Sequence, residues 1–394
     1  MTETTSSASP DVVAWQDFCR RMGDLGTRIL QDDFPASPAD QAEGVRHLAQ
    51  QLMCWIGWSV AHAEPDAPKF QRQNDLITKW GGPNVDNVYR HARIDPSRTY
   101  RISGRMNSCE DFIIAMRAGF MHMPKSGTKR EVSAKDLGIG EGDEFEIILS
   151  ATPHPGRWIP IDPDVVMASI REYYWDWRPA EPAMFVIECL DAPPTTDPTE
   201  RIGPAAELRD AATAVESSIA YWNDYLRRHR AELVDNVLGA PFKNPGGLDA
   251  ATYGFGFYNL GPDEALYIES EIPDARYWGF QLASLAWFES LEFANRVTSL
   301  NHEQATVSPD GRVRVVIAHR DPGVPNWLDT EGRGAGLVTY RWFWSPTAPH
   351  PTSTVVTLNR LRDVMPPETP YISPADRAAE IEQRRRHVAW RFRT

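Results

Sequence analysis

Apolar side chains recur at three- and four-residue steps in two segments near the start of the chain, from Trp15 to Ile29 and from Val45 to Trp55. This spacing predicts two amphipathic helices that pack on each other and on a larger body. A similar pattern from Leu208 to Leu226 predicts a third helix. Ser373-Pro374, followed by Asp376, has the sequence of a capped helix start, so we expect a final helix there.

From about Val88 the spacing of apolar residues shifts toward two, which is typical of strands. Short strands separated by Gly, Pro and Asp turns are predicted in two groups. A brief helix is predicted between the last strands of the first group, from Val165 to Tyr174. The two groups leave open that the chain contains two copies of one β architecture. The first group covers residues 100–104, 111–116, 144–149, 158–161 and 183–188, and the second covers residues 266–271, 277–285, 312–319 and 338–344.

The length of 394 residues exceeds one ordinary core and favours two packed domains. A stretch rich in Asp, Pro and Thr, residues 191–204, is the best candidate for the boundary between them. We therefore expect a helical region at 1–80, a first β domain at 81–200, a connecting helical segment at 201–245, and a second β domain with a terminal helix at 246–394.

Composition narrows the range of partners. The net charge of −13 argues against a nucleic-acid partner, because nucleic acid is itself polyanionic. The first residues lack the basic and apolar regions of a signal peptide, and no window of about 20 apolar residues could span a bilayer. We expect a cytoplasmic protein that does not contact membranes, with its four scattered cysteines reduced. Assembly into a homo-oligomer is left open.

The second β region carries a resemblance to a known family. The features that carry it are Tyr277-Trp278 in a strand, Asn295, Asp310-Gly311, Asn326-Trp327-Leu328 and Arg341-Trp342-Phe343. In these features the segment from Tyr253 to Trp344 resembles the domain of unknown function 1214.

A second resemblance lies upstream. Asn84-Val85-Asp86-Asn87-Val88-Tyr89, followed by Tyr100-Arg101, is similar to the Asn-Arg-Asp-Thr-x-Tyr pattern of the usual partner domain, domain of unknown function 1254. Val85 and Asn87 depart from that pattern. The resemblance implies a mainly β fold with added α: two antiparallel, jelly-roll-like β-sandwiches plus N-terminal helices, a connecting helix and a C-terminal helix. It supplies no catalytic residues, since the family has no agreed activity.

The polar residues of the first motif have two interpretations. Asn84, Asp86 and Asn87 follow Gly81-Gly82-Pro83, a turn where such side chains commonly bond the local backbone. Tyr89 comes directly after them, and this favours a ligand-facing role instead.

The aromatic residues of the second motif are equally open. Trp327 follows a proline and an asparagine, and either seals one end of a sandwich or offers a platform to a ligand. Trp342 and Arg341 alternate on the last strong strand, so they lie on opposite faces. Arg341 either holds an anionic or hydroxyl-rich group or forms an ion pair with Asp86 or Glu269.

For acid–base chemistry the chain offers Glu269 on a predicted strand and His302 further along. Neither His302-Glu303 nor His319 has the spacing of a zinc-binding helix, so we expect no metal and no cofactor. The expected function is the binding of a hydroxylated small molecule or glycan in an aromatic-lined cleft, by a cofactor-independent lyase or hydrolase or by a non-catalytic binding or assembly module. The expected catalytic residues are Asp86, Tyr89, Glu269 and His302, and the expected substrate-binding residues are Asn84, Asn87, Trp327, Arg341 and Trp342.

Overall fold

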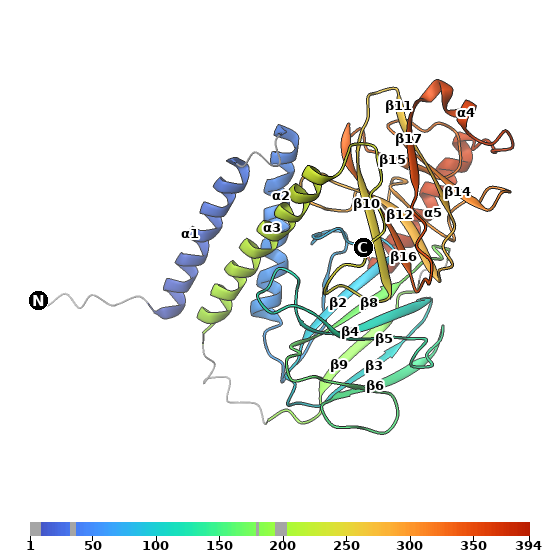
Figure 1. The fold of residues 1–394 in the computed structure, drawn as a ribbon. Coiled ribbons are helices and arrows are strands. Elements are labelled where there is room, and N and C mark those ends of the chain that lie inside the picture. The colour runs from blue at the N-terminus through green and yellow to red at the C-terminus, as the bar shows by residue number, and fades with distance from the viewer. Residues whose placement is uncertain (1–8, 32–36, 179–180, 194–202) are drawn as a thin grey trace, which may run out of the picture.

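Three helices form a layer beside the β body of the protein (Figure 1). A computed structural model of the chain describes residues 9–31, 37–178, 181–193 and 203–394. Helices α1 (Pro10–Gln31) and α2 (Pro38–Ile56) come first in the chain, and α3 (Ala205–Glu232) packs against both. The three helices predicted in these regions are confirmed. A π-helical turn (Gly57–Ala61) extends α2.

The helix starts follow from their capping residues. The Ser37 side chain accepts a hydrogen bond from the backbone N–H of Asp40, and Pro38 occupies the first turn of α2. At α5 (Pro374–Phe392), Ser373 and Asp376 form the predicted capping box. A 3-10 turn (Leu358–Arg360) and the short helix α4 (Leu361–Val364) lie between the last strand and α5.

The first β-sandwich follows α2 in the chain. Its core contains Val88 and Phe112 from one sheet and Ile102 and Ile147 from the other, so the two sheets pack face to face. One sheet has the order β1 (Gln71–Gln73), β2 (Asn87–Arg93), β8 (Met167–Tyr173), β4 (Asp111–Gly119) and β5 (Gly127–Ser133). The other has the order β7 (Trp158–Pro160), β6 (Glu144–Ser150), β3 (Tyr100–Arg105) and β9 (Met184–Cys189).

The second β-sandwich follows α3. Its core joins Phe280 and Val338 from one sheet to Ile268 and Val315 from the other. One sheet has the order β10 (Ala251–Asn259), β16 (Ala335–Phe343), β12 (Tyr277–Ala283) and β13 (Ser299–Asn301). The other has the order β15 (Trp327–Asp329), β14 (Arg312–Ala318), β11 (Glu264–Glu271) and β17 (Thr352–Thr357).

The two sandwiches share one strand arrangement. Each strand from β2 to β9 has a counterpart eight strands later, with the same neighbours in the same order. Even the single parallel pair is repeated, since β6 pairs with β7 in parallel and β14 with β15. The chain is therefore mainly β with added helices, and the alternative of two copies of one β architecture is confirmed.

The predicted helix from Val165 to Tyr174 is wrong. These residues form β8, which lies between β2 and β4 in the first sheet. Ala168 and Ile170 point into the sandwich core, whereas Arg171 points to the opposite face. A strand that is covered on both faces lacks a clear polar alternation, so its sequence can be mistaken for a buried helix.

The domain limits also need two corrections. Strand β1 pairs with β2, although its residues fall within the helical region expected at 1–80. Helix α5 contacts both sandwiches, since Val388 and Phe392 lie in the core of the first one. Of the boundary predicted at 191–204, residues 194–202 lie outside the described part of the chain.

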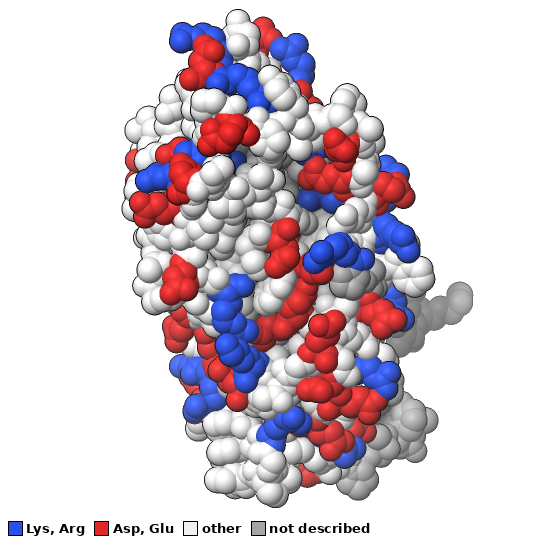
Figure 2. Space-filling model, turned by 90° about the vertical axis from the view of Figure 1, so that its right-hand side faces the viewer, with Lys and Arg blue, Asp and Glu red and all other residues white. Residues whose placement is uncertain are grey.

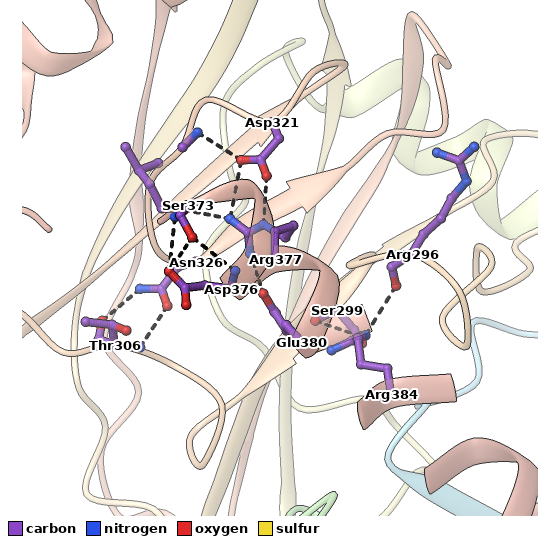
Figure 3. A network of polar contacts seen from close by, with 12 residues as sticks. Arg296, Ser299, Thr306, Asp321, Asn326, Ser373, Asp376, Arg377, Glu380 and Arg384 are labelled. Atoms are coloured by element: carbon purple, nitrogen blue, oxygen red, sulfur yellow. Dashed lines mark hydrogen bonds and ion pairs between the residues drawn. The ribbon is translucent and has the colours of Figure 1, made fainter. Parts of the chain in front are cut away.

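Arginines fasten α5 to the second sandwich, as Figure 3 shows. Arg377 donates to the Asp321 carboxylate at 2.9 Å, and Arg384 donates to the Ser299 hydroxyl at 2.7 Å. In the same view the Asn326 amide bonds the backbone of Thr306 at 2.7 and 2.8 Å. Asn326 has a positive φ of 54°, so this residue of the second motif stabilises a loop.

The surface carries no field of a single sign on the face that Figure 2 shows. Blue Lys and Arg side chains alternate there with red Asp and Glu side chains, and uncharged areas separate them (Figure 2). Within the described part of the chain, no helix is both long enough and apolar enough to cross a membrane.

Candidate functional site

A cavity of about 130 Å³ lies where the outer face of one sheet of the first sandwich meets the outer face of the matching sheet of the second. Strands β2, β4 and β8 contribute to it from the first sandwich, and β10 and β16 from the second. Helix α3 and the loops around Gly82 and Phe288 cover its remaining sides. The apolar part of the lining is aromatic and includes Trp80, Phe120, Trp222, Tyr225, Phe255 and Phe288.

Three arginines bring positive charge to this cavity. Arg117 lies on β4, Arg171 on β8 and Arg341 on β16. Arg117 and Arg341 are only 5% and 7% exposed, so their charges are largely removed from water. No Asp or Glu occurs among the described residues that line the cavity. The site is thus strongly cationic, and burial makes an unbalanced charge costly.

Two of the arginines occupy equivalent positions in the two sandwiches. Arg171 is the third residue from the end of β8 and lies opposite Tyr89, the third residue of β2. Arg341 is the third residue from the end of β16 and lies opposite Tyr253, the third residue of β10. The cavity therefore contains the same cross-strand Tyr–Arg pair twice, once from each sandwich.

Neighbouring groups hold each guanidinium in place. Arg341 donates to the carbonyl oxygen of Gly82 at 2.6 Å and to the Thr339 hydroxyl at 3.2 Å. The Arg171 guanidinium interacts electrostatically with the Tyr253 side chain, and its guanidinium carbon lies 5.5 Å from the centre of the Tyr89 ring. Arg341 is thus held by its own sheet and by the connecting loop, whereas Arg171 lies between tyrosines of the two sandwiches.

Arg117 is the least satisfied of the three. Its NH1 donates to the Thr128 hydroxyl at 3.2 Å, while its buried Nε has no hydrogen-bond partner among the described residues. Burial, together with the charge of Arg171, lowers the pKa of Arg117 to about 10. Arg117 remains charged at neutral pH, although the like charge of Arg171 repels it.

Two ionisable groups beside the arginines, His91 and Tyr89, are neutral at pH 7. Burial, and then the charges of Arg117 and Arg171, hold the pKa of His91 well below its ordinary value. Nδ1 of His91 lies 2.9 Å from the Ser169 hydroxyl, and its buried Nε2 has no partner among the described residues. Burial also raises the pKa of Tyr89, so this phenol keeps its proton at neutral pH.

A glycine pair shapes the loop that holds Arg341. Gly81 and Gly82 have φ angles of 66° and 62°, which L-residues with side chains rarely adopt. A Cβ on Gly81 would lie 2.6 Å from the Trp222 ring, and one on Gly82 would lie 2.4 Å from the Phe288 ring. Glycine is therefore required here by both backbone conformation and space.

Asn84 and Asp86 connect the two sandwiches just beyond this loop. Asn84 lines the cavity; its N–H donates to the Tyr89 hydroxyl at 2.9 Å and its side-chain amide to the Tyr277 hydroxyl at 2.9 Å. Asp86 lies outside the lining. Its carboxylate accepts from Tyr277 at 2.7 Å, from Trp177 at 2.8 Å and from the Asn301 amide at 2.9 Å.

The expected site residues thus divide into two sets. Asn84, Asn87, Tyr89 and Arg341 come together in the cavity. The remaining five lie elsewhere, and each has structural partners. Asp86 is the buried acceptor described above, and Glu269 is ion-paired with Arg312 and Arg314 at 2.9 and 2.8 Å. The centre of the His302 ring lies 5.4 Å from that of the Trp175 ring. Trp327 and Trp342 are buried in separate hydrophobic clusters.

The structure contradicts one of the two alternatives for Arg341, the ion pair with Asp86 or Glu269. Its bonds run to Gly82 and to polar side chains of its own sheet, and no ion pair with Asp86 or Glu269 occurs. Arg341 and Trp342 point to opposite faces of β16 as expected, with Trp342 in the core. Trp327 is buried in a hydrophobic cluster and its indole N–H donates to the Ala318 carbonyl at 3.0 Å, which favours the sealing role over the platform role.

Sequence reasoning missed Arg117, Arg171, His91 and Tyr253. Arg171 was assigned to a helix, which hid its place opposite Tyr89. Arg117 gave a usable signal, because a charged residue directly follows the apolar run from Phe112 to Met116 within β4. Tyr253 can be recognised as a site residue only from the strand register, which places it opposite Arg341. Within the described residues, no group of three or more His, Cys, Asp or Glu side chains is placed to hold a metal ion.

The fold and cavity define a two-sandwich protein with an arginine-rich site between its halves, and this architecture has a relative of known structure. The chain is 32% identical to an uncharacterized protein from Burkholderia cenocepacia. That crystal structure matches with a TM-score of 0.80 over 88% of this chain and 98% of the other. The chain belongs to the same family as the Burkholderia protein.

A second solved structure is more remote. A protein from Vibrio parahaemolyticus is 11% identical, with a TM-score of 0.45 over 77% of this chain and 96% of its own. No protein-family model and no curated protein matches the chain.

Proposed function

We propose that the protein binds a small organic acid in the cavity between its two sandwiches. The observation that carries this proposal is the convergence of Arg117, Arg171 and Arg341 on a site whose described lining contains no carboxylate. Guanidinium groups bind carboxylates through two directed hydrogen bonds and stay charged when buried. A bound anion would supply the negative charge that the lining lacks.

The rest of the lining suits the body of such a ligand. Aromatic rings offer an apolar surface, while Asn84, Asn87 and the Tyr89 hydroxyl offer a few directed polar contacts. This combination is typical of small-molecule sites and agrees with a hydroxylated ligand. An apolar cavity of ~150 Å³ holds benzene, so a space of about 130 Å³ favours a ligand of a few carbons.

The small volume of the cavity and the lack of carboxylates in its described lining argue against a glycan as the ligand. An oligosaccharide needs more room, and glycoside cleavage normally uses two carboxyl groups that flank the scissile bond. Glu269 lies on β11, away from the cavity, and Asp86 lies outside the lining and already accepts three side-chain hydrogen bonds.

Binding is favoured over catalysis at this site. The groups able to move a proton there are Tyr89, Tyr253 and His91, and two of them keep their neutral form at pH 7. A lyase would need one of these groups to accept a proton. His91 is a weak base here, because the charges of Arg117 and Arg171 disfavour its protonated form. The resemblance to domains of unknown function 1254 and 1214 supplies no activity and stays a prediction.

Calorimetric titration with a panel of short carboxylic acids tests the proposal. Arg341→Gln should weaken the binding of any acid found by about tenfold or more, because the fork and its charge are both lost. Arg101→Gln is the matched control, since Arg101 is a strand arginine exposed on β3 and paired with Glu188. Binding by no acid in the panel, or equal binding by both variants, would overturn the proposal.

A further inference from the structure

The cavity presents two equivalent cationic groups, one from each sandwich. Arg171 and Arg341 occupy matching positions on the matching strands β8 and β16. Each lies opposite a tyrosine in its own sheet. A ligand that binds at the junction of two equivalent half-sites is matched best when it carries the same group at both ends.

The charge of the site also exceeds what a single carboxylate balances. Three guanidinium groups line the cavity, and the described lining offers no Asp or Glu. The carboxylate of Glu131 acts on Arg117 from outside the lining, where it accepts the N–H groups of Asp249 and Ala250. His91 is neutral and adds neither sign of charge. One carboxylate would therefore leave most of the buried positive charge uncompensated.

The contacts of the arginines leave donors available for two acceptors. Arg341 uses NH1 for Thr339 and Gln281 and one N–H of NH2 for Gly82, so its Nε and its second NH2 hydrogen have no hydrogen-bond partner among the described residues. On the other side of the cavity, the buried Nε of Arg117 has no partner in the described structure. Donors of this kind therefore occur in both halves of the site.

We infer that the ligand is a short dicarboxylate, with one carboxylate bound by Arg341 of the second sandwich and the other by Arg171 and Arg117 of the first. This inference rests on the proposed binding of an organic acid and names its class. The limited volume of the cavity restricts the linker between the two carboxylates to a few carbons. The aromatic walls exclude water around that linker and strengthen both ion pairs.

Titration of the full chain with dicarboxylates and their half-esters tests this assignment. Malonate, succinate and glutarate are each compared with their monomethyl esters, which keep the shape and lose one charge. At least one diacid should bind about tenfold or more tightly than its half-ester. In Arg341→Gln and in Arg171→Gln this preference should largely disappear, because each variant removes one of the two half-sites. Arg101→Gln should keep it.

The alternative outcomes separate the two proposals. Half-esters that bind as tightly as the diacids would overturn the dicarboxylate assignment and leave the binding of organic acids intact. The failure of diacids and half-esters alike would remove both. Inorganic phosphate, a compact anion with a single centre, is expected to bind no more tightly than a half-ester. Tighter binding of phosphate than of every diacid would overturn the assignment of two separate carboxylates.

Discussion

The two sandwiches have the same strand order but line their shared cavity with different chemistry. His91 on β2 lies opposite Ser169, and the matching position on β10 is Phe255, opposite Thr339. At the matching positions of β4 and β12, Arg117 corresponds to Ala283. Of the pairs compared, only the Tyr–Arg pair occurs in both sandwiches. At these compared positions the first sandwich provides the ionisable groups His91 and Arg117, and the second provides Phe255 and Ala283.

This difference shows what the common framework determines and what it leaves free. Strand order and register place side chains at equivalent points on two facing sheets, whatever those side chains are. The identity of a few residues then decides whether a position holds a charge or an apolar group. An asymmetric ligand site can therefore arise between two halves of similar architecture.

The largest effect is expected where the halves differ outside the cavity. Asp86 accepts three side-chain hydrogen bonds, whereas the matching residue of the second sandwich is Ala250. Asp86→Ala should lower the free energy of unfolding by about 3–5 kcal/mol, because it removes a buried carboxylate that accepts hydrogen bonds from side chains of both sandwiches. Chemical denaturation measures this loss. Asp263→Ala, at an exposed ion pair, serves as control and should cost under about 1 kcal/mol. A loss below about 1 kcal/mol for Asp86→Ala would show that the junction is not held by this carboxylate.

The fold can be predicted from the sequence to a greater extent than the site. Periodicity located most strands and helices because it reports which face of each element is buried. It failed at β8, which is covered on both faces, and that failure concealed Arg171. The cavity depends on register and on contacts between residues far apart in the chain, such as Asn84 and Tyr277, and no local pattern encodes them. Asn84, Asn87, Tyr89 and Arg341 were found because polar residues beside strands are unusual in a β core.

A second prediction concerns a feature that both halves share. Trp158 on β7 and Trp327 on β15 occupy matching positions. Each donates its indole N–H to a carbonyl oxygen of the neighbouring strand, Trp158 to Ser150 at 3.2 Å and Trp327 to Ala318 at 3.0 Å. In both cases the acceptor lies two residues after the one paired with the tryptophan. Trp327 is only 6% exposed and Trp158 is half-buried. Trp327→Ala should therefore cost roughly 3–5 kcal/mol, and Trp158→Ala less, about 1–3 kcal/mol.

Thermal and chemical unfolding of the two tryptophan variants checks this order. Neither variant should alter the affinity for an organic acid below its own melting temperature, since both residues lie outside the cavity. An unchanged melting temperature for Trp327→Ala together with lost binding would contradict the sealing role assigned to this residue.

The last prediction concerns the residue just before β4 in the first sandwich and before β12 in the second. This residue is Glu110 in the first sandwich and Arg276 in the second. Arg276 forms an ion pair with Asp111, the first residue of β4. Glu110 accepts the N–H of Asp176 at 2.7 Å through one oxygen, and its buried second oxygen has no partner among the described residues. Burial raises the pKa of Glu110 to about 8, so the folded protein keeps a proton that the unfolded chain releases near pH 4.5.

The sign of the pH effect follows from this difference. Between about pH 4.5 and about pH 8 the folded state binds more protons at Glu110 than the unfolded state, so the contribution to stability falls as the pH rises. We expect a loss of about 1–3 kcal/mol across this range, less than the full shift implies, because the side chain retains some contact with water. Glu110→Gln keeps the acceptor for Asp176 and cannot ionise, so its stability should lack this fall. Denaturation curves at several pH values should show the fall in the unmodified chain and in the exposed control Glu141→Gln, and equal slopes in all three proteins would refute the assignment.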